Sequence, residues 1–440
     1  GVVKSLEEQE ALPSLVIDAK SGQVLTGNAE GINLWEIATK EDEDLQANFV
    51  HKCPACGGST GSRDSEVLTR LHPGNEALAS VVTQKVLEAL PAKAESADPV
   101  PFGGRALLTF SDNRQNAAFF APYLERTSRD LAVRTSLYQM LKDEDELIDL
   151  DMAADRILRR WRRKGAPVML DSSGAITTDT LVIKDLLTGY LGVEFCTPGS
   201  RRTSLEALGL ANVTYEKSML RGITRACEEH LPDFTKDELR ELTHFLLETI
   251  RREKAIVNLW DVPMKDPFIW GLYKWTRSFQ LYKQDEKVRY SWLTPEGSEI
   301  WSRRTWYLEK QLGVPKAVAR DFLAAFWEIC WDKKMLVAAK PGFALDARKI
   351  LIGTAKDKPV FVCEKCGLRQ RHQVRMKCVA FRCTGTVAEI SQEDRELEKV
   401  RNHYVRTYEA GLASTLRARE HTASLSTELR EQIEREFSEG

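Results

Sequence analysis

Four cysteines fall within one short stretch of this 440-residue chain, with the spacing Cys-x2-Cys-x11-Cys-x4-Cys. They are Cys363, Cys366, Cys378 and Cys383. Four thiolates can surround Zn2+ as a closed tetrahedron, and a Cys-x2-Cys knuckle supplies two of them from one tight turn. Gly367 follows the first pair, where a knuckle often needs a residue that accepts positive φ. A closed site has no position for water, so we predict a structural zinc ion. Four unrelated core thiols are the alternative.

A second knuckle, Cys53-x2-Cys56, is half of a metal site. His51 and His72 could complete it within the chain. A cysteine pair outside the chain, or a knuckle that has lost its metal, are the alternatives. The other cysteines lie in apolar contexts and are predicted to be buried packing residues: Cys196, Cys227 and Cys330.

The four-cysteine stretch is also basic. Its only acidic residue is Glu364, and its cations are Lys365, Arg369, Arg371, Arg375, Lys377 and Arg382. A small lobe of this charge can lie on phosphates, and the candidate contacts are Arg369, Arg371, Arg375 and Lys377. The alternative is a solvated surface that keeps the lobe soluble. A second basic block, 156–164, follows the acidic block 143–151, and we predict that the two pair with each other.

Composition narrows the class of protein. Lys and Arg number 63 against 65 Asp and Glu, so affinity for nucleic acid would have to come from a local patch. The length allows two to four globular domains. No apolar run approaches the roughly 20 residues of a membrane span, and the start is unlike a signal peptide. Nine cysteines without a secretory signal favour reduced thiols and a cytoplasmic location.

The elements that position these residues can be read along the chain. Residues 13–50 are expected to form short strands with a hairpin turn at 19–22, and 75–90 a helix. A linker, 91–104, leads to an apolar run, 106–110, that is typical of a buried parallel strand. The polar turn 111–113 and a helix follow it. Such a unit places functional groups at the carboxyl end of a strand.

The middle of the chain is predicted to be mainly helical from 130 to 255. Residues 260–331 hold eight of the ten tryptophans, which can stack on bases but are more often core in a helical domain. Residues 315–353 read as helix, strand, Pro-Gly turn and strand, the back half of a winged helix. A charged helix at 392–410, a strand-like segment at 414–425 and a helix capped by Ser426 complete the chain.

No catalytic constellation is evident. The chain has no G-x-x-x-x-G-K-[ST] loop to hold a nucleotide phosphate and no G-x-S-x-G or H-E-x-x-H sequence. We therefore assign no catalytic residue.

Two stretches resemble the second RecA-like domain of large bacterial superfamily 2 helicases, DEAD/DEAH-box proteins of DNA repair and phage defence that often carry a four-cysteine domain. The first contains Phe110-Ser111-Asp112-Asn113-Arg114-Gln115, similar to helicase motif IV. The second is 418–440, similar to the strand and helix before motif V. The resemblance implies that Ser111 and Arg114 lie near the nucleic-acid backbone. Arg114 could instead cap the local turn or pair with Asp112.

The resemblance covers about fifty residues and leaves an insertion of roughly 270 residues between them, far longer than an ordinary loop. It implies an internal fragment that lacks motifs I, II, V and VI. ATP and Mg2+ would then act only in the full-length parent. His421 could face the same groove as Arg114, or be a partly buried histidine with a satisfied partner.

We therefore predict an α/β fold: a partial RecA-like lobe with a large, mainly helical insertion, a winged-helix-like part and a four-cysteine zinc ribbon. The expected regions are 1–100 (β-rich knuckle and linker), 101–142 (start of the RecA-like domain), 143–285 (helical insertion), 286–355 (winged-helix-like), 356–390 (zinc lobe) and 391–440 (return to the RecA-like domain).

The predicted function is a segment of an ATP-dependent DNA helicase or translocase. Its expected partners are DNA, with RNA also possible, the rest of the helicase chain and proteins of a multi-subunit system, but no membrane. Two alternatives stay open: a non-enzymatic adaptor that docks a partner protein, and a winged-helix and zinc-ribbon DNA-binding module.

Overall fold

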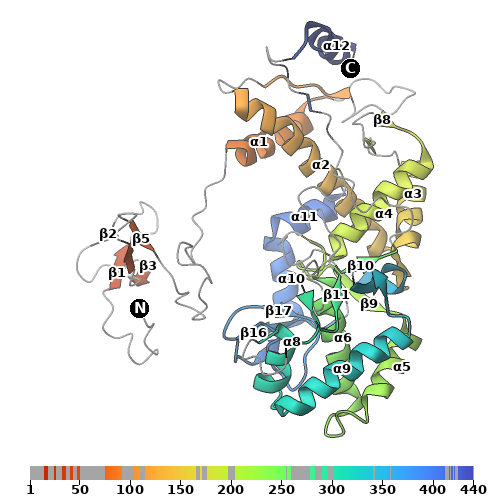
Figure 1. Cartoon of the computed structure of the whole chain (residues 1–440). Coiled ribbons are helices and arrows are strands. Elements are labelled where there is room, and N and C mark those ends of the chain that lie inside the picture. The colour runs from red at the N-terminus through yellow and green to blue at the C-terminus, as the bar shows by residue number, and fades with distance from the viewer. Residues whose placement is uncertain are drawn as a thin grey trace. The chain divides into compact units, whose positions relative to one another are not determined.

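A computed structural model provides the fold (Figure 1). It describes residues 14–17, 24–25, 32–35, 40–42, 47–49, 75–91, 104–109, 114–164, 169–170, 176–196, 204–253, 255–258, 278–282, 290–295, 301–339, 342–356, 358–411, 416, 418–419, 421 and 425–439. The chain divides into two compact units, Gly1–Pro73 and Gly74–Gly440.

The first unit contains short antiparallel strands. One sheet has the order β2-β1-β3, and a separate pair joins β4 to β5. The predicted hairpin is confirmed, since Ile17 pairs with Val24. The bounds are β1 Ser14–Ile17, β2 Val24–Leu25, β3 Ile32–Trp35, β4 Lys40–Asp42 and β5 Ala47–Phe49.

Helices dominate the second unit, as predicted for the middle of the chain. They are α1 Asn75–Ala89, α2 Arg114–Lys142, α3 Leu150–Lys164, α4 Thr180–Cys196, α5 Lys217–Cys227, α6 Lys236–Arg251, α8 Arg303–Trp306, the π-helical η4 Tyr307–Gln311, α9 Lys316–Asp332, α10 Gln392–Arg401, α11 His403–Ala410 and α12 Thr427–Glu439. No helix among the described residues combines the length and apolarity that crossing a membrane requires.

Local capping explains where several helices begin. Thr235 Oγ1 accepts from the N–H of Glu238, and the Glu238 carboxylate accepts from the N–H of Thr235, which is a capping box at the start of α6. Asn402 Oδ1 accepts from the N–H groups of Tyr404 and Val405. The predicted charged helix at 392–410 is therefore two helices, because the Asn402 side chain starts α11 in the middle of it.

One small sheet joins distant parts of the second unit. In the order β6-β15-β9, Ile352 of the central strand pairs antiparallel with Ile148 on one side and Val213 on the other. The strands are β6 Ile148–Asp149, β9 Ala211–Tyr215 and β15 Ile350–Thr354, which follows the short helix η5 Ala347–Lys349. A separate pair joins β7 Met169–Leu170 to β8 Ile176–Thr177.

The predicted helix and hairpin at 315–353 are present as α9, β13 and β14, with Leu336 paired to Leu345. The hairpin is not a free wing, however. β14 also pairs with β10 and β11, and β12 extends the sheet beyond β11. These strands are β10 Ile256–Val257, β11 Phe279–Gln280, β12 Tyr290–Ser291, β13 Leu336–Ala339 and β14 Gly342–Asp346.

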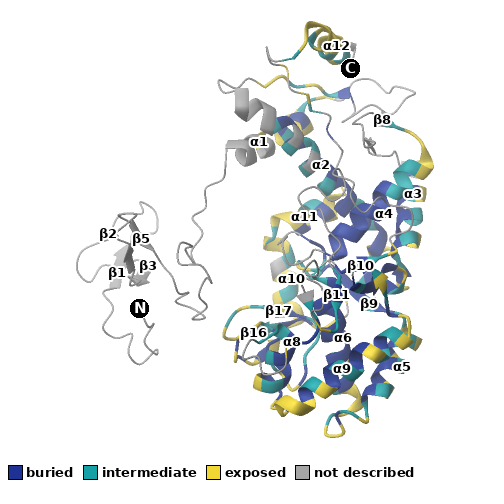
Figure 2. Ribbon diagram, in the orientation of Figure 1, coloured by how far each residue is buried: buried dark blue, intermediate teal, exposed yellow. Residues whose placement is uncertain are grey.

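One hydrophobic core runs from Val133 on α2 to Tyr408 on α11. Figure 2 shows it as the buried band through the second unit. Trp292 and Trp327 lie inside this core, as expected for tryptophans of a helical domain. The core includes residues from both sides of the predicted boundaries at 142 and 285, so these regions fold against one another.

The apolar run at 106–110 differs from its prediction. Residues 105–109 form no strand, and Leu108 is 61% exposed. A buried strand needs neighbouring strands to satisfy its backbone, and none of the described strands pairs with this segment. The described residues of the strand-like segment 414–425 likewise form no strand.

These two segments nevertheless pack together. Leu87, Leu124 and Leu416 form one small apolar cluster, and Leu107 and Ala418 pack against it. The N–H of Leu416 donates to Ser128 Oγ over 3.0 Å, and the N–H of Ala418 donates to Glu125 over 3.1 Å.

Candidate metal centre

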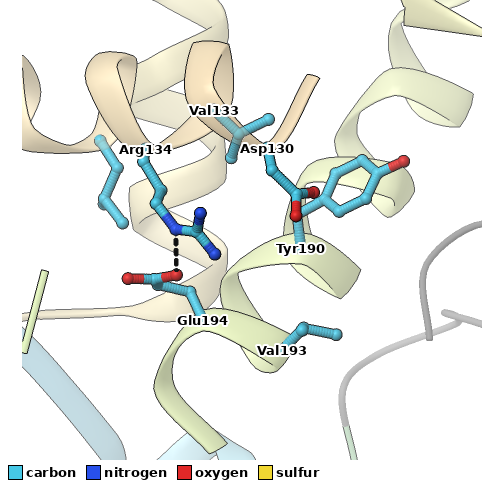
Figure 3. A pocket seen from close by; sticks show the side chains of 7 residues that line it. Asp130, Val133, Arg134, Tyr190, Val193 and Glu194 are labelled. Atoms are coloured by element: carbon cyan, nitrogen blue, oxygen red, sulfur yellow. Dashed lines mark hydrogen bonds and ion pairs between the residues drawn. The ribbon is translucent and has the colours of Figure 1, made fainter. Parts of the chain in front are cut away.

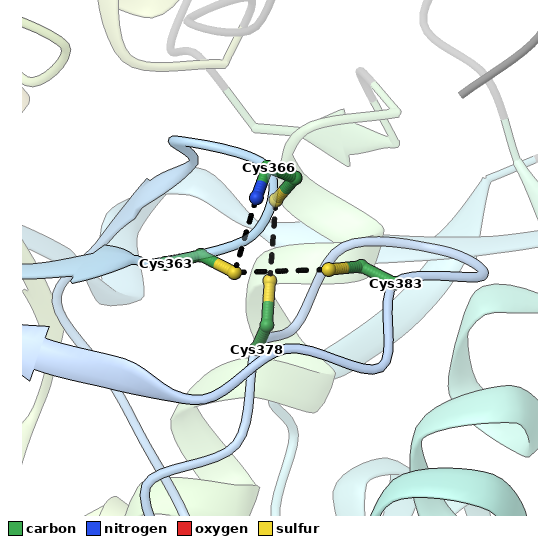
Figure 4. Close-up of side chains that lie close together, drawn as sticks. All are labelled: Cys363, Cys366, Cys378 and Cys383. Carbon is green, nitrogen blue, oxygen red and sulfur yellow. Dashed lines mark hydrogen bonds between the residues drawn. The ribbon is translucent and has the colours of Figure 1, made fainter. Parts of the chain in front are cut away.

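The four predicted cysteines come together (Figure 4). Their sulfur atoms all lie within 4.8 Å of one another, and all four are free thiols. Sγ of Cys363 is 3.7 Å from Sγ of Cys383, and Sγ of Cys366 is 3.6 Å from Sγ of Cys378. A tetrahedron with Zn–S bonds of about 2.3 Å has sulfur–sulfur edges of about 3.8 Å. The donor set therefore fits a tetrahedral metal ion such as zinc.

Each pair of ligands comes from its own turn. The N–H of Gly367 donates to the carbonyl of Cys363 over 2.9 Å, and Gly367 has φ +68°, as the sequence predicted. In the second turn the N–H of Cys383 donates to the carbonyl of Ala380 over 3.1 Å. Arg382 takes φ +61° there, an uncommon conformation for a residue other than glycine.

Backbone N–H groups point at the sulfur atoms. Those of Cys366, Ala380 and Gly385 each donate over 3.4 Å to Cys363, Cys378 and Cys383 respectively. Such bonds favour the thiolate, the form that binds metal.

The thiols of Cys363, Cys366 and Cys378 do not ionise equally. Burial opposes ionisation of Cys363, but hydrogen bonds from the N–H groups of Cys366 and Lys365 and from neighbouring thiols lower its pKa to about 7. Burial raises the pKa of Cys366 to about 11, and it also raises that of Cys378. One thiolate thus disfavours the next, and a bound cation is what would hold all four ionised.

Gly385 completes the site and was not anticipated. A Cβ at this position would lie 2.6 Å from Cys363 Sγ and 2.7 Å from the Cβ of Lys365, closer than atoms pack. The sequence signal was a glycine two residues after the last ligand.

The four cysteines lie together within a small three-stranded lobe. β16 Phe361–Cys363 pairs antiparallel with β17 Arg369–Gln370 and β18 Val387–Glu389. Apart from the cysteines, its buried cluster contains only Phe361 and Val387. So little apolar burial cannot fold a lobe alone, whereas a structural zinc contributes on the order of 10 kcal/mol.

Hydrogen bonds fix the lobe to the helical body. Gln311 Nε2 donates to the carbonyls of Cys378 and Cys383, Arg303 Nε donates to that of Val379, and Tyr307 Oη accepts from the N–H of Val374. No local sequence signal marks Gln311, Tyr307 or Arg303, because each acts on residues more than 60 positions away.

Two of the predicted phosphate contacts, Arg375 and Arg371, lie against the helical body. Arg375 Nε lies 2.8 Å from Glu238 Oε1, and its guanidinium stacks on Phe234. The end of Arg371 is buried without a hydrogen-bond partner among the described residues. Burial lowers its pKa to about 10, with Glu206 opposing. The Arg371 guanidinium is buried, whereas the Arg375 side chain is paired but 39% exposed.

The other predicted contacts lie elsewhere. Arg369 is exposed on β17, and Lys377 is partly buried at an isolated bridge with Thr386. Arg114 is the first residue of α2. Ser111 lies outside the described residues, as do Cys53 and Cys56 with His51 and His72. His421 Nε2 pairs with Glu434 over 2.8 Å, and its side chain is 43% exposed.

The remaining cysteines are packing residues, as predicted. Cys196, Cys227 and Cys330 are buried. Burial raises the pKa of Cys196 and Cys227 to about 12, so these thiols are inert.

A small pocket between α2 and α4 is the other candidate site (Figure 3). It is lined by Asp130, Val133, Arg134, Leu137, Tyr190, Val193 and Glu194. Arg134 Nε donates to Glu194 over 2.7 Å, and Glu194 also accepts from the N–H of Leu205. Burial opposes the charge on Arg134, but Glu194 more than offsets it and raises the pKa. The central charges satisfy each other, which is the pattern of a structural ion pair.

The acidic and basic blocks behave as predicted. Arg156 pairs with Glu144, and Arg160 lies 2.5 Å from Asp143. Arginines of the basic block on α3 therefore form ion pairs with carboxylates of the same chain.

Comparison with known proteins identifies no relative: no family model, curated protein or solved structure matches the chain.

Proposed function

We propose that this chain is a segment of an ATP-dependent DNA helicase or translocase, supplying part of the second motor lobe and a zinc-stapled insertion that contacts DNA. ATP hydrolysis would belong to the full-length protein, because this sequence has no phosphate-binding loop. Its partners are DNA and the rest of the motor.

The observation that carries this proposal is the contact between the two helicase-like stretches. The N–H of Ala418, the first residue of the second stretch, donates to the Glu125 carboxylate 293 positions earlier, over 3.1 Å, and Ala418 packs against the cluster that contains Leu124. The intervening chain thus leaves and returns at one place, as an insertion into a single domain must.

The charge of the zinc lobe supports contact with DNA. Lys365, Arg369, Arg375 and Arg382 are exposed, although Arg375 also pairs with Glu238, whereas the end of the Arg371 side chain is buried. Exposed cations on a rigid lobe can replace the counterions of a phosphate backbone, and this contribution weakens as salt rises.

The first test is DNA binding by the zinc-loaded 440-residue chain. We expect the affinity for a DNA duplex to fall linearly with salt on logarithmic axes, and Arg369→Ala with Lys377→Ala to reduce both the affinity and the slope. Arg221→Ala on the exposed surface of α5 is the matched charge control. No binding at about 50 mM salt would remove the DNA-contacting role.

A second test addresses the motor. The gene is read upstream of the codon for Gly1, and the protein of the whole reading frame is assayed for DNA-stimulated ATP hydrolysis. A G-x-x-x-x-G-K-[ST] loop upstream and stimulated hydrolysis are expected. The absence of both would contradict the helicase assignment.

A protein-docking adaptor is the second candidate, favoured by one observation. Leu397, Val400 and Tyr404 on α10 and α11 are exposed by 46%, 68% and 44%. Exposed apolar groups that gather on neighbouring helices mark interaction surfaces. A chain that binds no DNA and loses a protein partner on Val400→Glu would favour the adaptor.

A further inference from the structure

An aromatic and basic face lies where the zinc lobe meets α8. Trp301, Trp306 and Phe381 follow one another edge to face, with centroids 5.7 and 6.1 Å apart. Lys310 Nζ lies 4.8 Å from the Trp301 ring, and Arg382 Cζ lies 5.1 Å from the Phe381 ring. We call these five residues the aromatic-basic face.

The turn between Cys378 and Cys383 holds one end of this face at the surface. Phe381 and Arg382 stand between Cys378 and Cys383, so two ligands fix the turn on either side. Phe381 is 43% exposed, and Arg382 is held at φ +61°. A non-glycine residue persists in this conformation where the surroundings over-determine it, and such positions cluster at functional sites.

The cations of the face are available for a ligand. Lys310 and Arg382 are exposed, and neither forms an ion pair with any described residue. The nearby carboxyl is that of Glu309, whose pKa is raised by burial against the opposing effect of Lys316 and Lys310. Trp306 adds a buried indole N–H that has no acceptor in the described part of the chain.

The rings and cations of this face together indicate the class of ligand that it would bind. An exposed ring beside a cation offers a stacking surface for a base and a charge for the adjoining phosphate. Bases within a duplex have both faces covered by their neighbours, so the ring can serve only an unpaired strand.

We propose that the aromatic-basic face binds single-stranded nucleic acid, with a base stacked on Phe381 and the backbone on Arg382 and Lys310. This inference rests on the proposed contact with nucleic acid and adds its strandedness and the residues that read it. Because stacking uses the base, we expect DNA and RNA strands of one sequence type to respond alike.

The experiment measures fluorescence anisotropy of labelled oligo-dT of about 15 nucleotides with the zinc-loaded full chain. Oligo-rU and a duplex of equal length are the comparison ligands. We expect Phe381→Ala to weaken single-strand binding roughly tenfold, and Phe381→Trp to restore it. Arg382→Asn, which tolerates positive φ, should lower the logarithmic salt slope by about 0.7.

Matched controls separate the face from the rest of the lobe. Met376 is 39% exposed on the same lobe, and the Lys236 side chain is 82% exposed on α6. Met376→Ala and Lys236→Ala should bind as the parent does. Zinc content is measured for each variant, and if Phe381→Ala loses zinc, Arg382→Asn and Lys310→Ala decide the outcome.

Three results would overturn the inference. The first is parental single-strand affinity in Phe381→Ala, Arg382→Asn and Lys310→Ala, and the second is a tighter duplex complex that none of them changes. If the parent binds nucleic acid in either case, the proposed function survives and only this face is excluded. The third is a parent that binds no nucleic acid, which removes both.

Discussion

Arg375 of the four-cysteine lobe and Glu238 of α6 form an ion pair with 2.8 Å between Nε and Oε1. Glu238 also closes the capping box at the start of that helix. One carboxylate therefore caps the start of a helix and binds the four-cysteine lobe to that helix. Arg375, which the sequence offered as a phosphate contact, therefore also contributes to the fold.

We predict that Arg375→Asn lowers stability while changing DNA affinity less than Arg382→Asn does. Asparagine suits both positions because each has positive φ. The pair is partly exposed, so a double-mutant cycle with Glu238→Gln should give a coupling of about 0.5–1 kcal/mol by chemical denaturation. A larger loss of DNA affinity for Arg375→Asn would restore this arginine to the DNA interface.

The metal centre predicts a defined loss of zinc. Cys378→Ser should bind one equivalent less than the parent, as counted by a chromophoric chelator after unfolding. Its thermal midpoint should also fall, because metal binding supplies folding energy to the lobe. Cys227→Ala, also a change at a buried cysteine, should keep the parental metal content. Equal metal in Cys378→Ser and the parent would contradict the assignment.

Gly385→Ala should bind zinc more weakly even though it removes no ligand. The added Cβ would lie 2.6 Å from Cys363 Sγ, so a ligand must move. Overpacking of this kind costs about 1–3 kcal/mol, which corresponds to roughly a 5- to 150-fold weaker site. Gly222→Ala is the control, since Gly222 has no positive φ and its Cβ would meet only the Lys333 side chain, at 3.7 Å. Competition with a chelator of known affinity measures the difference, and equal affinities would refute the steric argument.

The His244 imidazole predicts a loss of stability in mild acid. It is buried and stacks on His372 at 4.2 Å, and burial, with His372 and Arg240 adding and Glu241 and Glu248 opposing, lowers its pKa to about 3. The unfolded chain binds this proton near pH 6.5 and the folded chain does not. The contribution of neutral His244 to the free energy of unfolding is therefore complete above pH 6.5 and is lost as pH falls.

Between pH 6.5 and 5 the loss should be about 2 kcal/mol, measured by urea denaturation. His244→Gln should flatten this slope, whereas His230→Gln at a partly exposed position should not. Glu241 has a lowered pKa as well: burial opposes the shift, and the contact with His372 drives it. The stability that Glu241 contributes is lost only as pH falls below its ordinary pKa of 4.5, outside this window. An unchanged slope in His244→Gln would exclude His244 as the source.

The sequence predicted the features that local pattern determines. Cysteine spacing located the four ligands, since two short turns bring them together. Helical periodicity located α1 and α12, and alternation located the β1–β2 hairpin. Each of these features depends on residues close in sequence.

The features that the sequence did not reveal depend on distant residues. The apolar run at 106–110 reads as a buried strand, yet a strand exists only where partners are available. The inward turn of Arg371 and the pairing of Arg375 require α6 and the loop at 204–210 to lie against the lobe. The spacing of the arginines does not reveal which of them will contact a neighbouring element in the folded chain.

The pairing of Ile148 with Ile352 in the sheet β6-β15-β9 has a consequence for biosynthesis. At typical elongation rates, roughly 10–40 seconds pass between synthesis of the first residue and synthesis of the second. During that interval β6 and β9 lack the central strand that joins them, and their unpaired backbone edges are open to other chains. A nascent protein of this design would benefit from a chaperone on the ribosome, and truncation before Ile350 should yield aggregates rather than a smaller folded domain.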